Sequence, residues 1–110
     1  MTAYLIATVR VDDPETYRKY TAQTPALVAK YGGKFIVRGG EVEALEGPES
    51  TSRIVVLEFP SKDVVNTFYH SPEYQEVAKI RHAAAESSFL LVDGVPEGVT
   101  APDAQVTKSG

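Results

Sequence analysis

Three short stretches of the sequence are apolar on both faces of a strand, and this feature restricts the fold more than any other. They are rich in β-branched and aromatic residues, which is typical of strands: YLIATVRV (4–11), RIVVLEF (53–59) and SFLLVD (88–93). Alternate residues of a strand point to opposite faces of a sheet. Val55, Leu57 and Phe59 therefore form one apolar face. Ile54 and Val56 form the other, so both faces of the predicted sheet need a cover.

Two segments between these strands carry helix signals. The first begins at Asp13-Pro14-Glu15, which combines an acidic cap with a proline in the first turn, and it ends at Gly32-Gly33. Pro25 lies inside this helix, which predicts the loss of one backbone hydrogen bond and a kink or a division. The second segment extends from Ser61 to about Glu86, with a break and a second cap at Ser71-Pro72.

A further strand at residues 34–38 (KFIVR) completes the order β-α-β-β-α-β. This order predicts an α+β, ferredoxin-like fold, with a four-stranded antiparallel sheet and two helices on one face. Residues 41–46 either continue the second strand or form a hairpin arm. We expect one domain over residues 1–95, followed by a flexible C-terminal tail at 96–110, which is polar and weakly patterned.

The chain has no spare element to cover the second face of the sheet. The simplest cover is a second copy, so we expect a homodimer through the open sheet face. Two sheets packed face to face would enclose a barrel, the arrangement called a dimeric α/β barrel.

Composition argues against several classes of protein. The net charge is −4 with the two signs mixed along the chain, which does not fit a nucleic-acid binder. The chain has no cysteine, and its two histidines lack the spacing of paired metal ligands, so we expect neither a metal site nor a cofactor. No apolar run approaches the roughly 20 residues of a membrane span, and the N-terminus lacks the features of a signal peptide. A cytoplasmic protein without membrane contact is the expectation.

Glu58 is the first candidate for chemistry, because its place in the strand puts it on the same face as Ile54 and Val56. A carboxylate on an apolar face needs a partner. It either forms a structural salt bridge or acts as a catalytic or ligand-orienting acid.

Two arginines are the next candidates. Arg81 lies on the apolar side of the second helical segment, where it can extend to solvent, pair with Glu58 or hold a substrate carboxylate. Arg38 ends the second strand beside Gly39-Gly40 and can bind the same kind of group. His82 follows Arg81 and is either a general acid–base residue or a surface residue.

Tyrosines supply the rest of the candidate site. Tyr20, Tyr69 and Tyr74 combine an apolar ring with a polar tip, which suits either a core or a ligand site. We expect a pocket between the second helical segment and the sheet, lined by these tyrosines together with Arg38, Glu58 and Arg81. The two glycine pairs at 32–33 and 39–40 do not form a phosphate loop, because such a loop follows a strand and opens a helix.

Several short motifs resemble a known family. They are DPETYRKY (13–20), YGG (31–33), RGG (38–40), EFPS (58–61), YHSPEYQ (69–75) and Arg81. Together they look like the domain of unknown function 1330 family, in the dimeric α/β-barrel superfamily, over residues from about 4 to 94. Phe68 is a departure, where many members have tryptophan. The resemblance implies a ferredoxin-like homodimer, and it implies no reaction.

Two functions remain open. In the first, the protein binds or transforms a small anionic or aromatic metabolite, with an arginine as anchor and Glu58 or His82 moving a proton. In the second, it is a non-catalytic dimeric module that is structural or sequesters a ligand.

Overall fold

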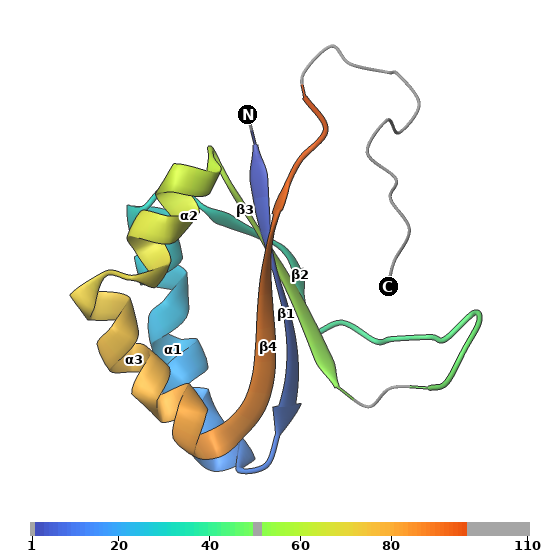
Figure 1. The fold of residues 1–110 in the computed structure, drawn as a ribbon. Helices are drawn as coiled ribbons and strands as arrows, with labels where there is room; N and C mark the ends of the chain where they lie inside the picture. Colours follow the sequence, from blue (N-terminus) through green and yellow to red (C-terminus); the bar gives the residue numbers. More distant parts are fainter. Residues whose placement is uncertain (1, 50–51, 97–110) are drawn as a thin grey trace.

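Four strands form a single antiparallel sheet in the order β2-β3-β1-β4. The computed structural model describes residues 2–49 and 52–96. Its elements follow the chain in this order (Figure 1): β1 (Ala3–Val11), α1 (Pro14–Lys30), β2 (Lys34–Arg38), β3 (Arg53–Phe59), α2 (Lys62–Tyr69), α3 (Pro72–Ala84) and β4 (Ala85–Asp93). This arrangement confirms the predicted order of strands and the predicted antiparallel, ferredoxin-like fold.

The helical layer contains three helices, not the predicted two, and all three lie on one side of the sheet (Figure 1). The second predicted helix is divided in two, because α2 ends at Tyr69 and the chain restarts as α3 at Pro72. Ser71 causes the restart, because its side chain accepts a hydrogen bond from the Tyr74 backbone N–H and Pro72 follows as the first helical residue.

The sheet has one covered face and one open face. Leu5, Val9 and Phe59 on the covered face are at most 4% exposed and pack in the core beneath the helices. On the open face, Leu90 is 62% exposed and Val92 is 44% exposed. The prediction that both faces are apolar is therefore confirmed, and within the described residues only one face has a cover.

The link between β2 and β3 differs from the expectation. Residues 40–49 contain no strand and extend away from the sheet on the side opposite the helices (Figure 1). Leu45 in this loop is 89% exposed. The predicted continuation of β2 ends at Gly39, whose φ of 69° turns the backbone into the left-handed region that strands do not use.

Two further expectations concern the C-terminal tail and membrane spans. Residues 97–110 of the predicted tail lie outside the described residues. In the part of the chain that the structure describes, no helix has the length and apolar character needed to cross a bilayer.

Candidate functional site

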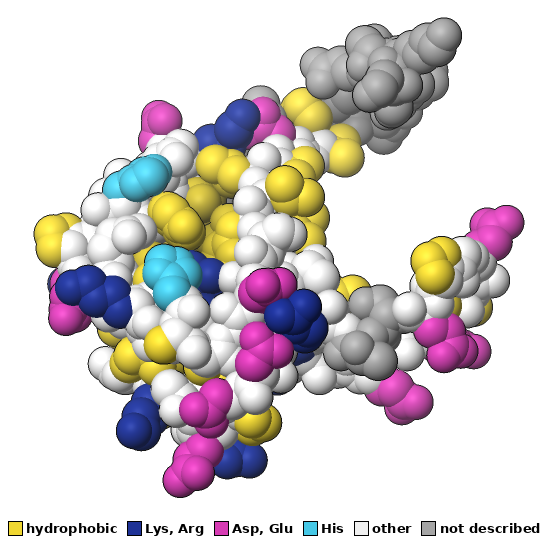
Figure 2. Space-filling view, turned by 60° about the horizontal axis from the view of Figure 1, so that its bottom comes forward, with side chains coloured by type: hydrophobic (Ala, Val, Ile, Leu, Met, Phe, Trp, Pro, Cys, Tyr) yellow, Lys and Arg dark blue, Asp and Glu magenta, His cyan; other side chains and the backbone are white. Residues whose placement is uncertain are grey.

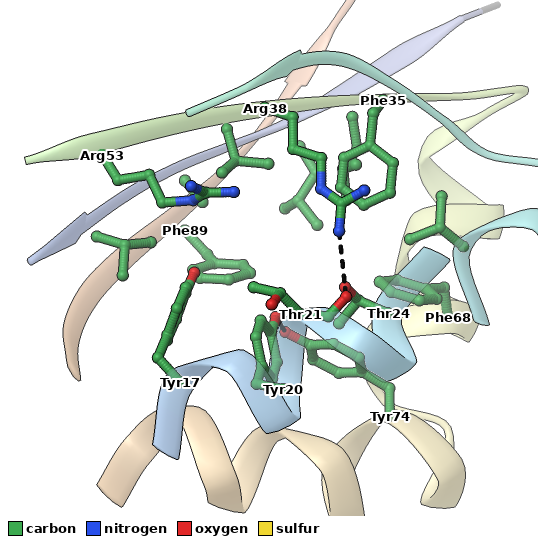
Figure 3. A pocket seen from close by; sticks show the side chains of 16 residues that line it. Tyr17, Tyr20, Thr21, Thr24, Phe35, Arg38, Arg53, Phe68, Tyr74 and Phe89 are labelled. Atoms are coloured by element: carbon green, nitrogen blue, oxygen red, sulfur yellow. Dashed lines mark hydrogen bonds between the residues drawn. The ribbon is translucent and has the colours of Figure 1, made fainter. Parts of the chain in front are cut away.

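A pocket lies between helix α1 and the covered face of the sheet, and aromatic and basic side chains surround it (Figure 3). Its enclosed volume is about 30 Å³, and about 500 Å³ lies between the atoms when solvent at its open mouth is included. Most of the lining is apolar. The polar members are Tyr17, Tyr20, Thr21, Thr24, Arg38, Arg53 and Tyr74.

Arg38 reaches this pocket because strand β2 contains an irregularity. Phe35 pairs with Leu57 and Arg38 pairs with Val55, although Arg38 is three positions after Phe35, an offset that would put the two side chains on opposite faces of a regular strand. The register shift between Phe35 and Val37 supplies the extra residue, so both side chains point to the covered face. The guanidinium of Arg38 lies 4.5 Å from the centre of the Phe35 ring.

Arg38 also crosses the mouth of the pocket to helix α1. Its Nη2 donates a hydrogen bond of 3.1 Å to the backbone carbonyl of Thr21 (Figure 3). That carbonyl would normally accept from the N–H four residues later, but Pro25 occupies that position and has no N–H. Helix α1 continues through Pro25 as one element, so the predicted division is not observed, and the lost backbone bond is replaced by Arg38.

Arg53 is the second guanidinium at the pocket. It starts β3 on the same face as Val55, and its guanidinium lies 6.0 Å from the ring centre of Tyr17. A side chain at Gly39 would collide with this guanidinium. The Nε of Arg53 is buried and has no hydrogen-bond partner. The second glycine pair therefore has a definite structural role, because its first member leaves the space that Arg53 fills.

The pocket carries positive charge without a matching acid. Among the described residues that line it there are two arginines and no aspartate or glutamate. The ion pairs of the described residues involve neither Arg38 nor Arg53. In a chain of net charge −4, this is a local reversal of sign.

Two tyrosine hydroxyls meet at the wall formed by the helices. Tyr20 and Tyr74 are joined by a hydrogen bond of 2.6 Å between their hydroxyl oxygens. Burial raises the pKa of Tyr20 well above its usual range, and the nearby Tyr74 raises it further. Burial likewise raises the pKa of Tyr74, although the Arg81 guanidinium opposes the shift. Both hydroxyls therefore stay protonated at neutral pH. One donates to the other in their mutual hydrogen bond, which leaves one O–H of the pair for a further acceptor.

Arg81 lies behind this tyrosine pair and does not line the pocket. It is 3% exposed, and its guanidinium lies 4.2 Å from the Phe89 ring centre and 5.8 Å from that of Tyr20. Its hydrogen-bond partners are the Ser87 hydroxyl and His82 Nε2, the latter at 3.3 Å. No carboxylate of the described residues pairs with it, so it adds a buried positive charge near the pocket wall.

The structure thus brings three of the seven predicted site residues to one pocket, namely Tyr20, Arg38 and Tyr74. Tyr69 packs outside it, with its ring centre 5.4 Å from Tyr74 and 6.0 Å from Phe89. Tyr69 and Phe89 are partly buried hydrophobic residues next to the core. Figure 2 shows hydrophobic side chains lining a hollow between the helices and the sheet.

Glu58 and His82 do not join this pocket. Glu58 lies on the open face, 3.1 Å from Lys34 Nζ, and it accepts a hydrogen bond of 3.3 Å from the Tyr4 hydroxyl. These contacts match the salt-bridge alternative for Glu58. His82 is exposed on α3, beside Arg81. Among the described residues, no group of three His, Cys, Asp or Glu side chains is placed to hold a metal ion.

Tyr17 and Arg53 belong to the pocket and were not among the predicted residues. Tyr17 could have been found, because it lies one helical turn before Tyr20 on the same stripe. Arg53 also had a signal, since it is in phase with the covered-face residues Val55 and Leu57. The β2 irregularity that turns Arg38 inward has no comparable signal in the sequence.

Solved structures with this fold include three of use here. RPA0582, a protein of unknown function from Rhodopseudomonas palustris, is 21% identical with a TM-score of 0.72, over 86% of this chain and 82% of that one. A dimeric protein of unknown function and ferredoxin-like fold from Bacteroides fragilis is 20% identical with a TM-score of 0.60, over 84% and 96%. SnoaB, a cofactor-independent oxygenase from Streptomyces nogalater, is 16% identical with a TM-score of 0.60, over 88% and 96%.

Identities this low establish the shared fold and no shared activity. No curated protein matches the sequence. The model of one family, the domain of unknown function 1330, matches residues 2–95, which is nearly the whole of the described chain. The chain therefore belongs to the domain of unknown function 1330 family.

Proposed function

We propose that the protein binds a small carboxylate with a flat apolar body in the pocket between α1 and the sheet. One observation carries the proposal: two guanidiniums line the pocket, and no acid among the described lining residues neutralises them. A guanidinium without a protein carboxylate is well suited to an anionic ligand, because it can donate two parallel hydrogen bonds to one carboxylate.

The rest of the lining supports the same ligand class. The rings of Tyr17, Phe68 and Phe89 offer flat apolar contact for a planar group. The enclosed volume of about 30 Å³ suits a water-sized group, so the ligand's body would occupy the open mouth and break the hydrogen bond by which Arg38 crosses it. The hydrogen-bonded hydroxyl pair of Tyr20 and Tyr74 offers one free neutral O–H donor at the far wall.

The same geometry limits what is proposed about catalysis. The likeness to SnoaB is a likeness of fold, so a reaction is not transferred from it. A proton transfer at this pocket would fall to Tyr20 or Tyr74, since Glu58 lies on the opposite face of the sheet. Binding is the proposed function, and it suits both an enzyme and a sequestering protein.

We also propose that the chain acts as a homodimer through its open sheet face. Exposed apolar residues on that face support this, among them Leu90 and Val92 on β4 and Ile36 and Val37 on β2. A contiguous apolar surface of this kind marks an interface. Similar structures from Bacteroides fragilis and Jannaschia are described as dimeric ferredoxin-like proteins.

Calorimetric titration with two matched compounds tests the binding proposal. Phenylacetate carries a carboxylate and phenylacetamide carries a neutral amide of nearly the same shape. We expect phenylacetate to bind at least about tenfold more tightly, because only the carboxylate gains charge-assisted hydrogen bonds from the guanidiniums.

Two variants test whether the preference for phenylacetate over phenylacetamide depends on the pocket. Arg53→Gln removes one lining guanidinium, and we expect it to remove most of the preference for the acid. Arg18→Gln is the matched control, since Arg18 is exposed on α1 and does not line the pocket. Equal affinity for the two compounds, or an equal loss in both variants, would contradict the proposal.

A further inference from the structure

We infer that the carboxylate ligand carries a hydroxyl on the carbon next to its carboxylate, which makes it a 2-hydroxycarboxylate. The inference rests on the proposed function and concerns the acceptor of the hydrogen bond that Arg38 donates. Arg38 is a donor at the mouth of the pocket, and the group it binds in this structure is an acceptor that also lines the pocket, the backbone carbonyl of Thr21.

Pro25 makes this carbonyl available. In a regular helix the carbonyl of Thr21 would accept from the backbone N–H of residue 25, but proline has none. Two side chains of the described residues donate to it instead, Arg38 Nη2 at 3.1 Å and the Thr24 hydroxyl at 3.5 Å. The shorter of these two bonds, the one from Arg38, is lost if Arg38 binds another group.

A ligand carboxylate at Arg38 would take that donor away from Thr21. Among the contacts of the described side chains, the carbonyl would then keep only the long one from Thr24, so it would lose the shorter and better of its two hydrogen bonds. A hydroxyl on the ligand restores the bond by donating to Thr21 while the carboxylate accepts from Arg38. The ligand would thus replace both partners of one existing hydrogen bond.

The direct contact between the two protein groups favours neighbouring groups on the ligand. Arg38 Nη2 and the Thr21 carbonyl are 3.1 Å apart before a ligand enters, so a ligand that opens this bond with little movement of Arg38 needs its acceptor and its donor on neighbouring carbons, as on a 2-hydroxy acid. A 2-amino acid has the same spacing, but its ammonium group would be repelled by the guanidiniums of Arg38, Arg53 and the buried Arg81. A neutral hydroxyl is not repelled by these positive charges.

Mandelate and phenylacetate differ only by this hydroxyl, and calorimetry on both compounds tests the inference. We expect the wild type to bind mandelate about three- to tenfold more tightly, the increment of one hydrogen bond. In a Pro25→Ala variant, the new N–H would occupy the Thr21 carbonyl. The mandelate advantage should fall below about twofold while phenylacetate still binds, because the guanidiniums are unchanged.

Pro72→Ala is the control, since Pro72 is the first residue of α3 and does not line the pocket, and it should keep the mandelate advantage. Alanine is favoured over proline inside a helix, so the Pro25→Ala variant should fold. If phenylacetate binds and mandelate binds no more tightly, the inference is overturned and the proposed function stands. If Pro25→Ala keeps the full advantage, the inference is also overturned. If neither acid binds the wild type, both proposals fail.

Discussion

At the scale of single residues, the site contains two polar groups with unusual hydrogen bonding. Arg53 Nε is buried without a hydrogen-bond partner, and the Thr21 carbonyl lacks its helical donor. Unpaired buried polar groups are costly in a folded protein, which makes Arg53 Nε a notable member of the pocket. The Thr21 carbonyl is paired, because Arg38 takes the place of the missing helical donor.

Gly39 offers a test at this scale. Gly39→Ala adds a Cβ that collides with the Arg53 guanidinium and must adopt a φ of 69°, so we expect a loss of about 1–3 kcal/mol in unfolding free energy and weaker phenylacetate binding. Gly40→Ala is the control, because nothing lies within 4 Å of its Cβ. Chemical denaturation of both variants checks the difference, and equal stabilities would contradict this role for Gly39.

The sequence allowed part of this residue-level account to be predicted. Arg38 was singled out because it ends a strand beside a glycine pair, and it does line the pocket. Arg38, Glu58 and Arg81 were predicted to line one pocket, and only Arg38 does. Glu58 is out of phase with the covered face, and Arg81 is separated from the pocket by Tyr20 and Tyr74. The distance of Arg81 from the pocket depends on how the helices pack on the sheet, and this packing cannot be predicted from the residues next to Arg81 in the sequence.

At the scale of elements, helices α1 and α3 form the wall that carries the tyrosine pair. In the interior, Tyr20 of α1 and Tyr74 of α3 are joined by the hydrogen bond between their hydroxyls. At the surface, an ion pair joins the same two helices, with Lys30 Nζ 2.7 Å from a Glu73 carboxylate oxygen. The Tyr31 hydroxyl also donates to Glu73. The hydrogen bonds from Lys30 and Tyr31 hold the pKa of Glu73 below its usual value.

This pKa shift predicts how the helix contact responds to acid. A carboxylate with a lowered pKa in the folded state contributes stability above its unfolded pKa of roughly 4.3, and this contribution is lost as the pH falls through the lower folded value. We therefore expect Glu73→Gln to lower the melting temperature at pH 7 and to have little effect near pH 2.5. Glu46→Gln, in the exposed 40–49 loop, is the control. A Glu73→Gln effect that is as large in acid as at neutral pH would contradict this assignment.

Element boundaries were predicted well where the sequence has strong local signals. The bounds of β2 and β3 agree with the prediction, and Asp13 caps α1 as expected. The predictions differ from the structure where contacts with another element, or a turn in the chain, outweigh the preferences of the local residues. Pro25 removes a backbone bond as predicted, but of the two predicted consequences the division of α1 is not observed, and a side chain from β2 replaces the missing bond. Residues 41–46 did not extend the strand, because Gly39 turns the chain first.

At the scale of the whole molecule, the open sheet face is the largest feature without a cover in the described chain. We expect a dimer at micromolar concentrations in analytical ultracentrifugation. Leu90→Glu should shift the mass to a monomer, because it places a charge on the proposed apolar interface. Ala22→Glu, on an exposed position of α1, should leave the dimer intact. A wild-type monomer would contradict the proposal.

The central claim is that an anionic ligand occupies the pocket beside Arg38 and Arg53, and a crystal structure with mandelate tests it most directly. The account predicts the carboxylate within hydrogen-bond distance of Arg38 or Arg53, with the ring against Tyr17 or Phe89 and the Arg38–Thr21 bond broken. Mandelate bound only elsewhere, or an intact Arg38–Thr21 bond over an empty pocket at saturating ligand, would contradict it.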